Sequence, residues 1–401
     1  MTDLAERSPS MMSSDTKGAH ETYLGTRTFG CLDGVRGLCI LGVIWHHTAP
    51  NLPWLFCSRG FLGVDMFFVL SGFLIVTLLL RERDRTGAIS LRNFYARRTL
   101  RIFPIYYLVL FLILCLYLVT KPGTTTARNY YASLPFLLTY TSNWVHVPMA
   151  NFVITWSLAT EEQFYLAWPV VEKLLKPVGV AVVLALVIIV NQLINYGVLD
   201  DWFRAIYGPK FRLAILEATF TPIALGVLLA HLLHGPKTFG RLWPVLGRPW
   251  SFLMFGGGAL VLIIAWPADI SGTGRLLIQL SMMLFLGSLV IREDQGARPV
   301  LTFRPLAYLG MISYGVYVYH MWAIHPLRIG FTKLGWKPAS FAFFLAAVLA
   351  SMLVAGLSYR FIEKPLLKLK SRFAGDASAR ETVVDPTAAA SRLAWVDRTT
   401  A

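Results

Sequence analysis

The stretch LDGVRGLCILGVIWHHT, residues 32–48, decides how this chain is interpreted. It is apolar enough to enter a membrane, yet it carries the ionisable residues Arg36 and His47 eleven positions apart. Eleven residues make close to three helical turns, so the two side chains share one helix face and lie about 16 Å apart along the axis. The neighbouring His46 points about 80° away from that face. Because ionisable groups are costly inside a bilayer, His47 is a candidate functional residue whose partner must be sought.

The composition of the whole chain predicts a polytopic membrane protein. Apolar residues make up 56% of the 401 positions, 15% are charged, and the mean hydropathy is +0.57. Apolar stretches near the length needed to cross a bilayer recur along the chain, and we place ten, at about 34–55, 61–80, 102–120, 153–172, 178–196, 213–234, 250–267, 273–291, 306–326 and 340–362. Because backbone hydrogen bonds must be satisfied within lipid, we expect an all-α bundle of about ten transmembrane helices.

The positive charges sort by loop. A net charge of +15 would favour a nucleic-acid partner in a soluble protein, but here Arg81, Arg83 and Arg85 follow the second predicted span, and lysines follow the last one. The positive-inside rule places these loops and both termini in the cytoplasm, which requires an even number of spans. We therefore expect no nucleic-acid partner and interpret these three arginines as topology-setting charges.

Polar segments flank the predicted bundle. Residues 1–28 lack an apolar core, so we expect a disordered cytoplasmic leader and no cleavable signal peptide. Residues 371–401 predict a disordered cytoplasmic tail, and 29–370 form the transmembrane domain. The four cysteines show neither a CxxC pair nor a histidine-linked metal spacing, so no metal site is expected.

Ionisable groups on four of the predicted helices fall at similar depth. With a cytoplasmic N-terminus, His47, Asp65, Glu161 and His320 all lie in the outer halves of their spans. Glu161 belongs to a polar stripe at i, i+4 and i+8 that comprises Ser157, Glu161 and Tyr165. Single intramembrane polar residues can hold helices together, but two histidines with two carboxylates at one level favour a polar cavity.

Six blocks carry a resemblance to a known family: residues 32–48, GVDMFFVLSGFLI (63–75), FYARRTLRIFPIYY (94–107), WSLATEEQFYLAWP (156–169), SYGVYVYHMW (313–322) and RFIEKP (360–365). In order and spacing they resemble the membrane-bound acyltransferase-3 family, which includes O-antigen, nodulation-factor and macrolide acyltransferases. The resemblance implies transfer of an acyl group, commonly acetyl from acetyl-CoA, to a hydroxyl of a carbohydrate, glycolipid or glycosylated natural product. It also implies that Arg36 and His47 match the family's essential Arg/Lys and His signature, whereas His46 does not. A multi-pass protein of a bacterial cell membrane is the implied location.

The chemistry of acyl transfer gives these residues roles. A sugar hydroxyl attacks a thioester poorly unless a base removes its proton, and the pKa of histidine suits that task, so His47 is the predicted general base. A carboxylate on the other ring nitrogen would orient the imidazole; Glu161 is the first choice for it and Asp65 the second. His320 is a further catalytic candidate at the same depth. In a less favoured variant, His47 itself accepts the acyl group as a covalent intermediate.

The donor is predicted to bind from the cytoplasmic side. Arg36, Arg98 and Arg101 lie near the inner interface, and arginines suit the phosphates of acyl-CoA because they form bidentate hydrogen bonds. The pantetheine arm would then follow the first helix toward His47. Acyl-CoA is a substrate in this interpretation, and no permanently bound cofactor is expected.

A transporter or flippase for a glycan or lipid is the alternative function, because its polar midplane would bind substrate without covalent chemistry. Internal repeats would favour that alternative, and none is visible in the sequence. The sequence therefore favours an acyltransferase with membrane lipids around it and a carbohydrate acceptor of unknown identity.

Overall fold

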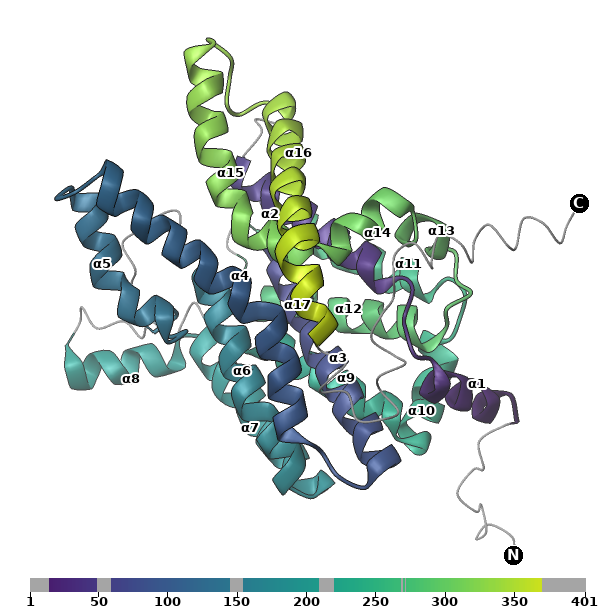
Figure 1. Cartoon of the computed structure of the whole chain (residues 1–401). Coiled ribbons are helices and arrows are strands. Elements are labelled where there is room, and N and C mark those ends of the chain that lie inside the picture. The colour runs from purple at the N-terminus through teal and green to yellow at the C-terminus, as the bar shows by residue number, and fades with distance from the viewer. Residues whose placement is uncertain are drawn as a thin grey trace, which may run out of the picture.

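The computed structural model of the chain describes residues 14–48, 59–144, 154–208, 220–267, 270 and 272–369. Over these residues every regular element is a helix (Figure 1). The first nine are α1 (Ser14–Gly25), α2 (Leu32–Thr48), α3 (Leu62–Thr86), α4 (Leu91–Thr120), α5 (Thr125–Leu138), α6 (Thr155–Leu174), α7 (Pro177–Asn195), α8 (Val198–Tyr207) and α9 (Thr221–His234). The others are α10 (Pro236–Leu246), α11 (Ser251–Ala265), α12 (Gly272–Ile291), α13 (Arg298–Leu301), α14 (Arg304–Met311), α15 (Ser313–Lys333), α16 (Phe341–Ser358), a π-helical turn at Tyr359–Glu363 and α17 (Lys364–Lys368).

Helices long and apolar enough to cross a membrane recur through the fold. Within the described residues there are five, namely α3, α4, α7, α12 and the run Phe341–Lys368. The pair α10 and α11, bent by 76°, adds a sixth if the two form one span. The protein is therefore a multi-pass membrane protein with a helical bundle. The predicted span 306–326 is divided between α14 and α15 by a break at Ile312, and the start of 213–234 lies outside the described residues.

Local sequence sets several helix ends. The Ser90 hydroxyl accepts from the Asn93 amide at the start of α4, and the Ser340 hydroxyl accepts from the Phe343 amide at the start of α16. Each satisfies an amide that lacks an intrahelical partner. Helix α3 ends at Thr86, and the next residue, Gly87, has a φ of 75° that suits glycine and turns the chain toward α4.

Reciprocal glycines bring α3 and α9 together in the most extensive helix contact of the described fold. A Cβ atom on Gly72 would lie 2.1 Å from the carbonyl oxygen of Ile223, and one on Gly226 would lie 2.2 Å from that of Val69. Small residues allow such close backbone approach, which gains dispersion energy inside a membrane where apolar burial gains little. The same device joins α2 to α14, where a Cβ on Gly310 would overlap the Asp33 carbonyl. These contacts fix α2 and α3 at the centre of the bundle.

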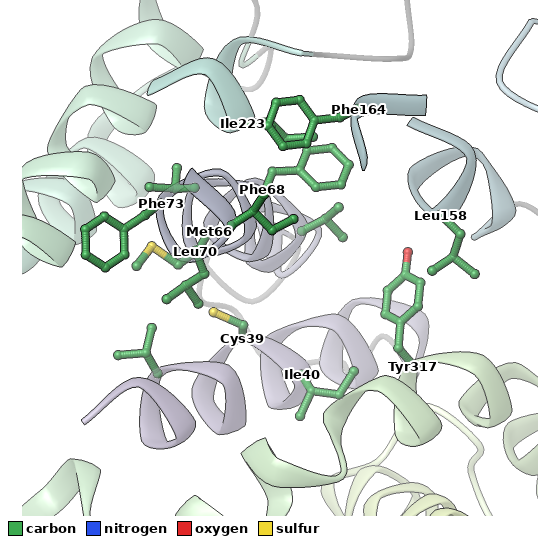
Figure 2. Close-up of a cluster of buried hydrophobic side chains, with 14 of the residues drawn as sticks. Cys39, Ile40, Met66, Phe68, Leu70, Phe73, Leu158, Phe164, Ile223 and Tyr317 are labelled. Carbon is green, nitrogen blue, oxygen red and sulfur yellow. The ribbon is translucent and has the colours of Figure 1, made fainter. Parts of the chain in front are cut away.

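The buried core is shared by α2, α3, α6, α9 and α15. Figure 2 shows Phe68 of α3 facing toward α6, where Phe164 lies, and Tyr317 of α15 with its hydroxyl directed toward Leu158 of α6. Phe68, Leu158 and Tyr317 are all buried. In Figure 1, α15 and α16 run side by side away from this core.

The structure differs from the predicted disordered leader over Ser14–Gly25, which forms α1. The rings of His20 and Tyr23 are buried and lie 4.6 Å and 5.9 Å from the Phe239 ring of α10, measured between centroids. Two buried aromatic contacts offset the entropy lost in ordering a polar segment, and mean hydropathy does not reveal them. Residues 1–13 and the predicted tail at 371–401 lie outside the described residues.

Candidate active site

A cavity of about 340 Å³ lies among α2, α3, α4, α6 and α15. Helix α3 provides its longest wall, with side chains at three- and four-residue spacing: Val64, Phe68, Ser71, Leu74, Leu78 and Arg81. The helix rises about 25 Å from Val64 to Arg81. The wall is apolar at the first end, carries Ser71 near its middle and is cationic at the other end, so the cavity suits an elongated ligand with one charged end.

All three arginines predicted for donor binding line this cavity: Arg36 from α2, and Arg98 and Arg101 from α4. Arg36 also donates to Asp33 over 3.1 Å, which leaves the guanidinium's other N–H groups to bind elsewhere. The Arg98 guanidinium lies 5.0 Å from the centroid of the Tyr165 ring, a cation–π contact that fixes its direction. Three helices far apart in sequence thus bring a group of cations and an aromatic ring to one wall.

The polar stripe of α6 also faces the cavity, as its spacing predicts: Ser157, Glu161 and Tyr165 all line it. The Glu161 carboxylate accepts hydrogen bonds from the hydroxyls of Ser71 and Tyr165. Among the described residues these are its partners, and it does not reach His47. Its proposed support of the imidazole therefore stays a prediction without a direct contact.

His47 meets His320 instead. The Nδ1 atom of His47 lies 3.3 Å from the Nε2 atom of His320, and the ring centroids are 5.0 Å apart. His320 is fully buried on α15, and His47 is half-buried near the end of α2. His46 lies on another side of α2, with its ring 5.6 Å from that of Phe61. The centroids of the His46 and His47 rings lie 5.2 Å apart, but the rings have different further partners, Phe61 for His46 and His320 for His47, as the helical phase predicts.

Carbonyl oxygens define which nitrogen of each neutral ring carries the proton. His47 Nδ1 lies 2.9 Å from the Val43 oxygen, and His320 Nδ1 lies 2.7 Å from the Tyr317 oxygen. A carbonyl oxygen only accepts, so both Nδ1 atoms are the donors. The one Nδ1 proton of His47 is then shared between the Val43 oxygen at 2.9 Å and the lone pair of His320 Nε2 at 3.3 Å, and the shorter contact is the one to Val43. His47 Nε2 is left as an unprotonated, basic nitrogen.

Asp65, the second choice for orienting His47, has other partners. Its carboxylate is fully buried and receives two hydrogen bonds of 3.0 Å from Arg275 of α12 and one of 2.8 Å from Gln279. A bidentate pair of this kind neutralises both charges and joins α3 to α12. Its contacts are those of a structural ion pair.

Tyr317 separates the cavity from the histidines. Its side chain lines the cavity, its hydroxyl lies 2.5 Å from that of Ser157, and its carbonyl accepts from His320 one turn further along α15. Within the described residues, neither His47 nor His320 lines the cavity. The cationic cavity and the imidazole pair are therefore two adjoining centres rather than one.

The sequence profile of the acyltransferase-3 family, described as an acyltransferase domain, matches residues 29–360. The chain belongs to the acyltransferase-3 family. It is 28% identical over 393 residues to the O-acetyltransferase OatA of Staphylococcus aureus. This match covers 89% of this chain and 60% of the relative. It is also 28% identical over 373 residues to the peptidoglycan O-acetyltransferase OatA of Listeria monocytogenes, which covers 84% of this chain and 55% of the relative. The chain thus spans about 60% or less of the length of these relatives, and no solved structure matches it.

Two further arginines of this acyltransferase-3 chain line the cavity without having been predicted to bind there. Arg27 follows α1 and is exposed, and Arg81 lies near the end of α3. The sequence predicts Arg81 to be one of several topology-setting charges, and Arg27 lies in the leader that it predicts to be disordered. The position of Arg81 at i+10 from Ser71 lies about 80° round α3, so helical phase relative to Ser71 gave no signal for Arg81. Arg81 shares the three- and seven-residue spacing with Leu78 and Leu74, which also line the cavity.

Proposed function

We propose that the protein is a membrane O-acyltransferase that moves an acyl group, in the first instance acetyl, from acyl-CoA to a carbohydrate hydroxyl. Its family and the names of its relatives support this proposal. The relatives include a peptidoglycan O-acetyltransferase, so the acceptor class that we propose is a cell-envelope glycan or a glycolipid.

The observation that carries the proposal is the cationic cavity that adjoins the imidazole pair of His47 and His320. Arg36, Arg98 and Arg101 place guanidinium groups where the diphosphate of acyl-CoA would bind, because arginine forms charge-assisted, bidentate hydrogen bonds with phosphate. The apolar end at Phe68 and Tyr317 would receive the pantetheine arm. The arm in this proposal follows α3, not α2 as the sequence suggested, because the cavity lies along α3.

In the proposed reaction His47 acts as general base. Its Nε2 atom takes the proton of the acceptor hydroxyl while the hydroxyl oxygen attacks the thioester carbonyl carbon. The C–S bond breaks, an ester C–O bond forms, and the CoA thiolate takes a proton from the imidazolium or from water. The Val43 carbonyl and His320 Nε2 both accept from Nδ1 of His47 and so keep its ring in the required tautomer, the role predicted for a carboxylate.

Ten membrane spans and cytoplasmic termini complete the proposal. Both follow from the loop charges, and they place the arginine-lined end of the cavity toward the cytoplasm, where acyl-CoA is available. His47 would then lie toward the outer face, where an envelope glycan can reach it. Cysteine labelling of single-cysteine variants at Arg85 and Lys337, in intact and opened cells, tests this orientation, since the two positions should label from opposite sides.

The activity is tested with the purified protein in lipid vesicles, radiolabelled acetyl-CoA and a set of glycan acceptors. We expect release of CoA thiol coupled to labelling of one acceptor, and loss of both in His47→Ala. His46→Ala is the matched control, since it removes an adjacent imidazole that packs on Phe61, whereas His47 meets His320. Binding of a glycan without any transfer from acetyl-CoA would favour a transporter over this proposal.

A further inference from the structure

We propose that the N-terminal segment 14–29 is a wall of the donor cavity, in which Arg27 recognises the ribose 3′-phosphate of acyl-CoA and Arg81 positions Arg27. The inference rests on the proposed function, because it takes acyl-CoA as the donor. It gives a substrate-binding role to a segment that the sequence presents as a polar leader, and it concerns a phosphate distinct from the diphosphate assigned to Arg36, Arg98 and Arg101.

The segment is anchored to the bundle at several points. His20 Nε2 approaches the carbonyl oxygen of His234 at 3.0 Å, and the rings of His20 and Tyr23 pack on Phe239. The imidazole of His234 in turn lies 3.1 Å from a carboxylate oxygen of Asp84. Because α1 packs on α10 and α12 and His20 bonds the last residue of α9, the residues that follow α1 have a defined position.

Arg81 fixes the end of α1. Its NH1 group donates to the carbonyl of Thr26 at 2.5 Å, and its NH2 group donates to that of Tyr23 at 2.8 Å. The last carbonyls of a helix lack intrahelical partners and carry partial negative charge, so a guanidinium there satisfies both needs. The Arg81 guanidinium also lies 5.5 Å and 5.4 Å from the ring centroids of Tyr23 and Phe29. This one side chain therefore holds residues on both sides of Arg27.

Arg27 is placed to bind an anion. It lines the cavity together with Thr28 and Phe29, and its side chain is exposed. Arg81, which holds it, lies ten residues beyond Ser71, about 15 Å along α3. Arg98 contacts the Tyr165 ring, and the Tyr165 hydroxyl donates to Ser71. The group formed by Arg36, Arg98 and Arg101 therefore lies near Ser71, at the opposite end of this stretch of about 15 Å of α3 from Arg81. The cavity thus offers two separate cationic groups.

Acyl-CoA carries phosphate at two separate places, a diphosphate at the pantetheine arm and a monophosphate on the ribose. A donor whose diphosphate binds Arg36, Arg98 and Arg101 and whose acyl end points toward Tyr317 must direct its nucleotide the other way, toward Arg27 and Phe29. An arginine fork suits a terminal phosphate there, because such a phosphate presents several oxygens to the same guanidinium.

The test measures binding of acetyl-CoA and of acetyl-dephospho-CoA, which lacks only the 3′-phosphate, to the full chain in detergent by calorimetry. We expect the wild-type protein to bind acetyl-CoA about tenfold more tightly, as one partly exposed charge-assisted contact allows. Arg27→Ala should bind both ligands with the affinity that the wild type shows for acetyl-dephospho-CoA. Lys17→Ala, which removes an exposed cation of α1 that does not line the cavity, should keep the tenfold preference.

Arg81→Lys tests the positioning role separately. Lysine keeps the charge but has no fork with which to hold two carbonyls at once. We expect faster amide hydrogen exchange in residues 14–29 without any ligand, together with a reduced preference for acetyl-CoA. Unchanged exchange in this segment would overturn the positioning role.

The outcomes separate this inference from the proposed function. Equal binding of both ligands by the wild-type protein would show that Arg27 does not recognise the 3′-phosphate. The same conclusion would follow if Arg27→Ala kept the tenfold preference, or if it lowered the affinity for both ligands to the same extent. In each case the assignment of acyl-CoA as donor would stand. If the wild-type protein bound neither ligand, the donor assignment itself would be wrong.

Discussion

Gly226→Ala tests whether the α3–α9 contact holds the wall of the cavity in place. The added Cβ would lie 2.2 Å from the Val69 oxygen and 2.8 Å from the Phe73 nitrogen, whereas ordinary contact begins at 3.4 Å. Both neighbours are backbone atoms, which cannot change rotamer, so the two helices must separate by about an ångström. Overpacking of this kind costs about 1–3 kcal/mol, and we expect the upper part of that range because a whole helix must move.

The assay is equilibrium unfolding of the purified protein in mixed micelles, followed by tryptophan fluorescence, together with acetyl transfer. The matched control is Gly258→Ala in α11, where a Cβ would meet no atom within 4 Å. That replacement should be neutral or stabilise by up to about 1 kcal/mol through helix propensity. Gly226→Ala should unfold more readily than the control and lose activity, since Ser71 and Arg81 of α3 both line the cavity. Equal stability of the two variants would refute the packing argument.

Three further predictions concern single side chains. His47→Ala should lower the turnover of acetyl transfer about 10²- to 10⁴-fold, the usual contribution of a general base, whereas His46→Ala should retain activity; comparable loss in both, with expression intact, would count against the base. Arg98→Ala should weaken acetyl-CoA binding about ten- to a hundredfold in calorimetry without changing acceptor affinity, because it removes a charge-assisted phosphate contact. Asp65→Ala should destabilise the fold by about 3–5 kcal/mol because it leaves Arg275 buried without its counter-charge, and replacing both residues by apolar ones should restore much of that loss; normal stability with lost turnover would instead return Asp65 to catalysis.

Features that reside on one helix were predictable from spacing. The stripe Ser157, Glu161 and Tyr165 faces the cavity because i, i+4 and i+8 share a side, and the phases of His46 and His47 differ for the same reason. The all-helical class followed from composition and from the need to satisfy backbone groups in lipid.

Partnerships between helices were not predictable, since they depend on how the bundle packs. The sequence paired a carboxylate with His47, but Glu161 contacts Ser71, which lies 90 positions earlier. Asp65 finds Arg275 at a separation of 210 residues. Hydropathy and periodicity describe each helix alone, and the glycine contacts that set which faces meet leave only a weak trace in one sequence.

The division at Tyr317 constrains how the two centres work together. The cavity ends at the Tyr317 side chain, which Ser157 holds through its hydroxyl, and His320 follows after one turn, a rise of about 4.5 Å. In the proposed reaction, a thioester bound at the arginines would reach His47 only if the acyl end passed this side chain or the side chain moved. A small acyl group would pass more readily than a long one, because Phe68 and Leu158, which line the cavity with Tyr317, are themselves buried apolar side chains (Figure 2).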